Sequence, residues 1–163
     1  MATLQDEVII NGMRLRNRIA MPPLTTNYGT PEGIVTEDIM QFYTERSNDV
    51  GLVIVEACAV RADGRILRGS LGLWDDGQVT GMARLAAAIK KLGAAAVVQI
   101  SHAGARCYPA GGEMQGASPS GFVFRPDVAP ISLSLEQIDQ IVADFAAAAG
   151  RAAEAGFDGV EIH

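Results

Sequence analysis

The sequence has little of what metal-binding, disulfide-rich or nucleic-acid-binding proteins are built from. Its 163 residues include two cysteines, Cys58 and Cys107, which stand far apart and form no CxxC pair. They indicate neither a zinc site nor a disulfide framework, so we expect no metal site. Lysines and arginines number 13 against 19 aspartates and glutamates, without a basic cluster, so we expect no nucleic-acid partner.

Long apolar runs are also missing. No run approaches the roughly 18 residues that cross a bilayer, so we expect no membrane span. The segment Met1–Glu7 has neither the basic nor the apolar region of a signal peptide. Together with the low cysteine content, this favours a reduced, cytoplasmic location. A hydrophobic content of 48% rules out disorder as the main state, and the length corresponds to about one domain.

The common motifs of nucleotide-binding and hydrolytic enzymes are absent as well. The sequence contains no GxGxxG after a strand, no GxxxxGK[ST] phosphate loop and no GxSxG. Ser101 and His102 are neighbours in the chain, which does not by itself make a nucleophile and its base. Neither a dinucleotide clamp of that kind nor a hydrolase is indicated.

What is present is an alternation of strand and helix signals. Asn11-Gly12 between two short apolar runs predicts a hairpin with a type I′ turn. Apolar runs predict strands over 18–21, where Pro22-Pro23 stops the run, and over 52–57, 95–100 and 159–163. Helices are predicted after an N-cap at Thr36, over 77–92, and after a capping box of Ser134 and Gln137. A long loop rich in glycine and proline fills about 101–133.

The pattern is therefore a hairpin, three βα units and a fourth strand. Two architectures of the α/β class fit it: a doubly wound open sheet, or half of a β/α barrel. Periodicity alone does not choose between them. In both, ligands bind at the carboxyl ends of the strands.

Polar side chains stand at those strand ends. Gln99 is either a core amide bonded to backbone or a two-sided partner for the edge of a heterocycle. His163 is either a core histidine or a donor to a carbonyl oxygen or oxyanion. Thr25 caps a turn or places a hydroxyl near a cofactor. Glu56 and Glu161 are each a buried structural carboxylate or part of an ion pair, with no catalytic role assigned.

Four segments, taken together and in order, resemble a known family. They are Leu15–Thr25, Val55–Ala57, Gln99–Gly104 and Gly156–His163. They resemble the old yellow enzyme family, the FMN-dependent NADH:flavin oxidoreductases. Asn27–Gly29 and Trp74–Asp76 are most similar to its bacterial ene-reductase and dienoyl-CoA-reductase-like branch. The resemblance implies that residues 1–163 form the N-terminal half of a single FMN-binding (β/α)8 TIM-barrel domain, with a hairpin followed by (βα)3β.

The resemblance also implies a site and a reaction. FMN would accept hydride from NAD(P)H and pass it to the activated C=C bond of a small-molecule enone or related alkene. His163 matches the histidine that holds the substrate carbonyl, and Tyr28 matches a tyrosine over the substrate. The residues expected to line the flavin are Pro22, Pro23, Leu24, Thr25, Ala57 and Gln99.

The length sets a further expectation. A complete β/α barrel takes about 200 residues or more, and its phosphate-binding loops typically follow strands seven and eight. We therefore expect the 163-residue chain alone to bind FMN weakly or not at all, and to be inactive. A half-barrel exposes two parallel edges, so a homo-oligomer or a complementary C-terminal half-barrel is the expected partner. The alternative function is a non-catalytic scaffold or interaction module without flavin.

Overall fold

The computed structural model describes residues 1–108, 114–116 and 130–163, and its centre is a parallel sheet of four strands. These are β3 (Ala20–Met21), β4 (Leu52–Ala59), β5 (Ala95–Ser101) and β8 (Gly159–Ile162). The strands lie side by side in chain order, β3-β4-β5-β8. A doubly wound sheet reverses its order at a switch point, so this order is that of a β/α barrel.

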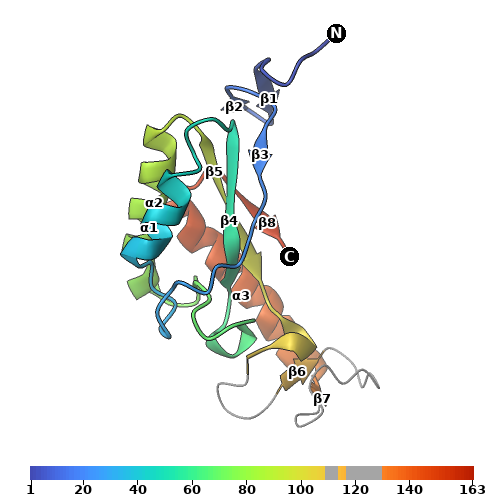
Figure 1. The fold of residues 1–163 in the computed structure, drawn as a ribbon. Helices are drawn as coiled ribbons and strands as arrows, with labels where there is room; N and C mark the ends of the chain where they lie inside the picture. Colours follow the sequence, from blue (N-terminus) through green and yellow to red (C-terminus); the bar gives the residue numbers. More distant parts are fainter. Residues whose placement is uncertain (109–113, 117–129) are drawn as a thin grey trace.

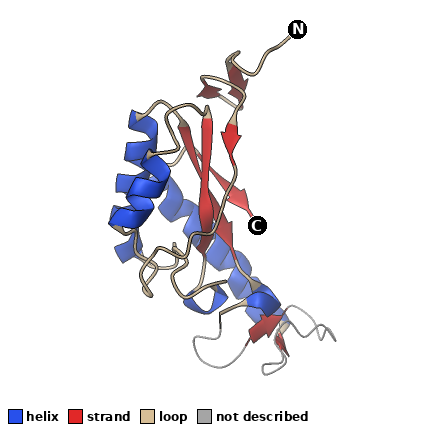
Figure 2. Cartoon of the chain, in the orientation of Figure 1, coloured by secondary structure: helices blue, strands red, loops and turns tan. Residues whose placement is uncertain are grey.

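Three helices cover the sheet. They are α1 (Glu37–Thr44), α2 (Val79–Lys91) and α3 (Leu135–Glu154). Helix α2 lies between α1 and α3, and the three pack along one side of the sheet (Figures 1 and 2). Buried side chains between the two layers form one continuous core, in which Val53 and Val55 of β4 meet Ile39, Leu85 and others from the helices. Among the described residues the helices cover one face of the sheet, which again matches a barrel rather than a doubly wound sheet.

The turn and the helix caps predicted from local sequence are present in the structure. Strands β1 (Val8–Ile10) and β2 (Met13–Leu15) pair around Asn11-Gly12, whose φ angles of 47° and 86° are both positive. The Thr36 side chain accepts the Ile39 N–H at the start of α1. Ser134 and Gln137 form the predicted reciprocal capping box of α3.

Three boundaries differ from the sequence prediction. Strand β3 ends before Pro22 as predicted but begins at Ala20 rather than at residue 18, and the Ile19 N–H donates to the Asn17 side chain instead. Helix α2 begins at Val79, since Asp75 caps a short 3-10 turn over Asp76–Gln78 just before it. The long loop predicted over about 101–133 contains a 3-10 turn at Gly104–Arg106 and the strands β6 (Met114–Gly116) and β7 (Pro130–Ser132). Residues 109–113 and 117–129 of this loop lie outside the described residues.

Strand β4 contains one extra residue relative to β5. Val55 lies opposite Val98, but Cys58 lies opposite Ile100, so Glu56 and Ala57 together face the single residue Gln99. Such a bulge changes which face the following side chains occupy. Val55 and Cys58 both belong to the core under the helices, although three positions separate them.

The end of the sheet at which its strands begin is held by Arg16. Its guanidinium donates to the carbonyl oxygens of Ser47, Val50 and Leu92 at 2.9, 2.9 and 3.0 Å, and also to that of Asn48. Three of these carbonyls lie in the α1–β4 connection and the fourth lies just after α2, so one half-buried cation joins two connections to the segment before β3. Figure 1 shows the hairpin β1–β2 at this end, far from β6 and β7.

The capping box of α3 has a measurable contribution to stability. Replacing Ser134 with Ala removes the hydroxyl that accepts the Gln137 N–H at 3.2 Å. We expect the free energy of unfolding to fall by about 1 kcal/mol in chemical denaturation. Ser134→Thr keeps an acceptor oxygen and should retain most of this free energy. Equal losses of stability in the two variants would contradict the cap as the cause.

Candidate functional site

A cavity of about 350 Å3 opens where β4, β5 and β8 end. It brings together residues from four strand ends that lie far apart in the sequence. The lining residues are Pro23, Thr25, Ala57, Ile66, Gln99, Ser101, His102, Ala103, Arg106 and His163. Five residues that the sequence predicted as cofactor or substrate contacts are among them: Pro23, Thr25, Ala57, Gln99 and His163.

Two other predicted flavin contacts, Pro22 and Leu24, are not among the described lining residues. Both side chains are exposed, and Leu24 keeps 55% of its surface open to solvent. An extended segment turns successive side chains to opposite sides. Pro23 and Thr25 therefore reach the cavity with their side chains while Pro22 and Leu24 do not.

Tyr28, the predicted substrate contact, also lies outside this cavity. Its ring packs edge-on against Phe42 of α1, with ring centroids 6.4 Å apart, and lines a separate surface depression there. Asn27 has a φ of +63°, a left-handed conformation that turns the chain between Thr26 and Tyr28. Resemblance along the sequence does not reveal this turn.

Gln99 presents a fixed amide to the cavity. Its side chain is 7% exposed, and its Nε2 donates to Oε1 of Glu161 at 2.7 Å. The two residues face each other in the register of β5 with β8. With one N–H bound to Glu161, the carbonyl oxygen and the second N–H of Gln99 form the polar edge that a planar heterocycle requires.

His163 extends the β8 ladder and borders the cavity. Its backbone N–H donates to the carbonyl of Ile100 at 3.0 Å. Its side chain is exposed and lines the cavity. An imidazole held on a strand end at the rim of a cavity can donate a hydrogen bond to a bound oxygen atom.

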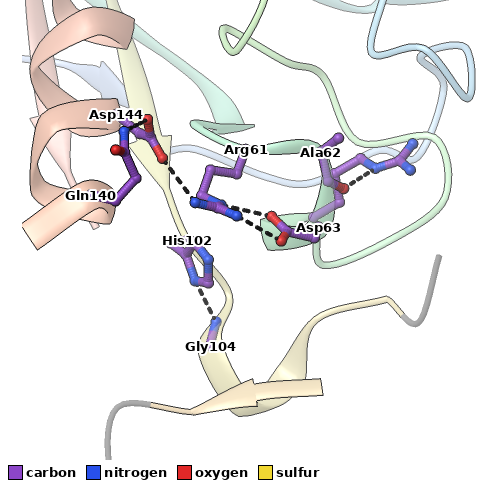
Figure 3. A network of polar contacts seen from close by, with 8 residues as sticks. Arg61, Ala62, Asp63, His102, Gly104, Gln140 and Asp144 are labelled. Atoms are coloured by element: carbon purple, nitrogen blue, oxygen red, sulfur yellow. Dashed lines mark hydrogen bonds and ion pairs between the residues drawn. The ribbon is translucent and has the colours of Figure 1, made fainter. Parts of the chain in front are cut away.

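His102 has a more structural environment at the end of β5 (Figure 3). Its Nδ1 accepts the Gly104 N–H at 3.1 Å, and its ring lies against Gly64 so closely that a Cβ there would be 2.7 Å from a ring carbon. The ring is thereby held between the loop after β4 and the turn after β5. This side chain shapes the wall of the cavity.

An ion-pair network lies next to His102 and joins the end of β4 to α3 (Figure 3). Arg61 donates to both carboxylate oxygens of Asp63 at 2.9 and 3.0 Å and to Asp144 at 3.3 Å. Gln140 donates to the other oxygen of Asp144. The hydrogen bond to Asp63 raises the pKa of Arg61, so the guanidinium stays charged and holds the loop in place.

Glu56 is the residue at this site whose contacts the sequence did not reveal. Its side chain has no exposed surface, and it accepts bonds from the Thr26 N–H and hydroxyl and from the Tyr43 hydroxyl. Burial raises its pKa. Burial also raises the pKa of Tyr43, with Glu56 adding to the effect. The sequence feature that could have pointed to Glu56 is an acidic residue inside an apolar strand, one position before the cavity residue Ala57.

None of the helices among the described residues combines the length and the apolar character needed to cross a bilayer. Nor does this part of the chain hold a group of three or more side chains placed to bind a metal ion.

Comparison with known proteins assigns the fold to a family. Residues 8–163 match the NADH:flavin oxidoreductase / NADH oxidase family. The chain belongs to this family. Its members use FMN with NAD(P)H, the cofactors that the sequence predicted.

Named relatives agree with this family. The chain is 39% identical to the NADH:acrylate oxidoreductase of Vibrio harveyi, over 100% of this chain and 17% of that protein. It is also 39% identical to the NADPH dehydrogenase of Bacillus subtilis (strain 168), over 96% of this chain and 46% of that protein. The chain thus spans about half of the second relative and less than a fifth of the first.

Solved structures give the same assignment. The old yellow enzyme homologue from Zymomonas mobilis superposes with a TM-score of 0.88 at 30% identity, over 99% of this chain and 48% of that one. Morphinone reductase superposes with a TM-score of 0.86 at 29% identity, over 98% and 47%. The prediction of a hairpin followed by (βα)3β from the first half of an old yellow enzyme barrel is confirmed.

The burial of Glu56 predicts a pH dependence of stability. Its pKa in the folded state lies above the ordinary value of 4.5, so the folded protein binds this proton more tightly than the unfolded chain does. The stabilising contribution of the protonated group is complete below pH 4.5 and is lost as pH rises through the folded pKa. The charged or polar groups around it are Thr26, Tyr43 and Cys58.

Glu56→Gln cannot titrate and provides the measurement. We expect the wild-type free energy of unfolding to decrease relative to that of Glu56→Gln as pH rises above 4.5. Denaturant titrations at several pH values would show this trend. A wild type that gains stability over the variant across the same pH range would contradict it.

Proposed function

We propose that this cavity binds the isoalloxazine ring of FMN in an ene-reductase-type oxidoreductase that contains this chain. The observation that carries the proposal is the convergence of Thr25, Ala57, Gln99 and His163 on one cavity from four strand ends. Ligand sites of β/α barrels lie at this end of the strands. Membership of a flavin oxidoreductase family supports the same ligand.

The chemistry of the cavity walls fits a flavin. The Gln99 amide retains an acceptor oxygen and one donor N–H, which suit the alternating carbonyl and N–H groups of the pyrimidine edge. Thr25 adds a hydroxyl to the cavity lining, while Pro23, Ala57 and Ile66 supply apolar surface for a flat ring. When bound, FMN supplies the hydride chemistry, accepting hydride from NAD(P)H and delivering it to the substrate.

His163 is the residue we assign to the substrate. From the rim of the cavity its ring can donate a hydrogen bond to the carbonyl oxygen of an activated alkene. Hydride arrival at the β-carbon places negative charge on that oxygen, so this bond strengthens in the transition state and lowers the barrier. The names of two relatives, NADH:acrylate oxidoreductase and NADH:fumarate oxidoreductase, support a small α,β-unsaturated carbonyl or carboxylate substrate.

The proposal predicts a coloured, active protein and a specific defect. Protein produced from the complete reading frame should show the visible absorbance of bound flavin and oxidise NAD(P)H in the presence of cyclohexenone or acrylate. His163→Ala should lower kcat roughly 100-fold or more, because a donor to the developing oxyanion is lost, while FMN stays bound.

Lys91→Ala, on the exposed end of α2, is the matched surface control and should retain activity. Full activity of His163→Ala would contradict the assigned role. A colourless protein that takes up no added FMN would instead support the scaffold function.

We also propose that both edges of the sheet pair with further strands. Val160 and Ile162 of β8 are 37% and 76% exposed, and the outer edges of β3 and β8 carry parallel backbone groups that favour pairing. The strands could come from a longer chain, from a complementary half-barrel or from a second copy.

The size of the native assembly tests this pairing. We expect the 163-residue chain, produced alone, to sediment as a dimer or larger species rather than as a monomer, because its open edges associate. Sedimentation velocity over a range of concentrations measures this. A single monomer boundary together with full cooperative unfolding would contradict it.

A further inference from the structure

We propose that Glu56 is a positioning residue of the cofactor site, whose carboxylate holds the Thr25–Thr26 segment against β4 and so places the Thr25 hydroxyl at the cavity. The inference rests on the FMN site proposed above. It concerns a side chain that does not line the cavity and acts through its neighbours.

The segment after β3 needs such an anchor. Strand β3 pairs with β4 only through Ala20 with Leu52 and Met21 with Val53. Pro22 and Pro23 then follow, and neither has an N–H to continue the ladder. Among the described residues, the next hydrogen bonds from this segment to β4 are those of Thr26 to the Glu56 side chain.

The contacts between Thr26 and Glu56 are multiple. The Thr26 N–H lies 3.2 Å from each carboxylate oxygen, and the Thr26 hydroxyl donates to Oε2 at 2.8 Å. The same hydroxyl accepts the Tyr28 N–H at 3.2 Å. The carboxylate therefore holds Thr26, the residue after the cavity residue Thr25, and through the Thr26 hydroxyl it also holds Tyr28 on the far side of the turn at Asn27.

A residue of the helix layer also bonds Glu56. Tyr43 of α1 is fully buried, and its hydroxyl accepts the Glu56 N–H at 2.7 Å and lies 3.4 Å from Oε2 as a donor. Glu56 and Ala57 lack individual partners in the β5 register because of the bulge. Tyr43 thus accepts the backbone N–H of a residue within the bulge, while Ala57, the other residue of the bulge, lines the cavity.

The donors around Glu56 make its replacement by Gln informative. The Thr26 N–H, the Thr26 hydroxyl and the Tyr43 hydroxyl all point toward the carboxylate oxygens. Gln has the same shape, but its NH2 group would face donors and leave at least one bond unmade. Thr26→Val removes only the hydroxyl and keeps the backbone, so it isolates the side-chain bond.

The first measurement needs no cofactor. In hydrogen exchange of the full protein, Glu56→Gln and Thr26→Val should each speed exchange of the Thr26 amide and of residues 24–28 by about tenfold or more, as expected for loss of bonds to a charged group. Exchange in α2 should not change. Thr26→Ser restores the hydroxyl and should restore slow exchange.

The second measurement follows the cofactor. In Thr26→Val the Kd for FMN should rise by about tenfold and the visible flavin bands should shift, because the Thr25 hydroxyl is no longer held in place. Thr26→Ser should restore both the Kd for FMN and the position of the flavin bands. Thr44→Val is the matched control, since that hydroxyl donates to Met40 O within its own helix at 2.8 Å, and it should leave both unchanged.

The outcomes separate the two proposals. Faster exchange with altered FMN affinity and spectrum, both restored by Thr26→Ser, supports the positioning role. Normal FMN binding and spectrum in Thr26→Val and Glu56→Gln, or unchanged exchange of residues 24–28, overturns it while leaving the proposed function intact. A wild type that takes up no FMN overturns the proposed function, and the role toward the cofactor with it.

Discussion

Side chains along a strand alternate between its two faces, and β4 departs from that alternation once, between Val55 and Cys58. Without the extra residue, the strand could not keep Val55 and Cys58 under the helices and also turn Ala57 to the cavity. Within the bulge, the Glu56 N–H donates to the buried hydroxyl of Tyr43. Core packing, the cavity wall and the attachment of the segment after β3 all depend on this irregularity.

The cavity is a product of topology more than of any single motif. Parallel strands in chain order bring their carboxyl ends to one edge, and short polar sequences placed there meet in space. Gln99 and Glu161 show how neighbouring strands cooperate, since each lies opposite the other in the register and their side chains bond. The orientation of the Gln99 amide is thus set by the strand next to its own.

Local signals in the sequence were sufficient for much of the fold. Asn11-Gly12, Thr36 and Ser134 each act within a few residues, so their turn and caps could be predicted without tertiary information. The barrel order was different, because apolar strands alternating with helices fit two architectures. The ordered resemblance to a family favoured the barrel, and the strand order in the structure decided it.

The parts that escaped prediction depend on contacts between distant residues. Tyr28 turns toward α1 because Asn27 adopts a left-handed conformation, which no periodicity encodes. Glu56 was assigned no catalytic role, and a structural carboxylate was one of its two interpretations. What the sequence could not show was that its partners are Thr26 and Tyr43, which lie 30 and 13 residues before it.

The four carbonyl contacts of Arg16 have a consequence for how such a protein can change over evolutionary time. They join connections at the end of the sheet away from the cavity, where Asn17 adds a bond to the carbonyl of Asp49. The residues that line the cavity lie at the other end and take no part in this arrangement. Selection can therefore change the loops that line the cavity, and with them the ligand preference, while the loops bonded to Arg16 at the opposite end keep the arrangement of the strands.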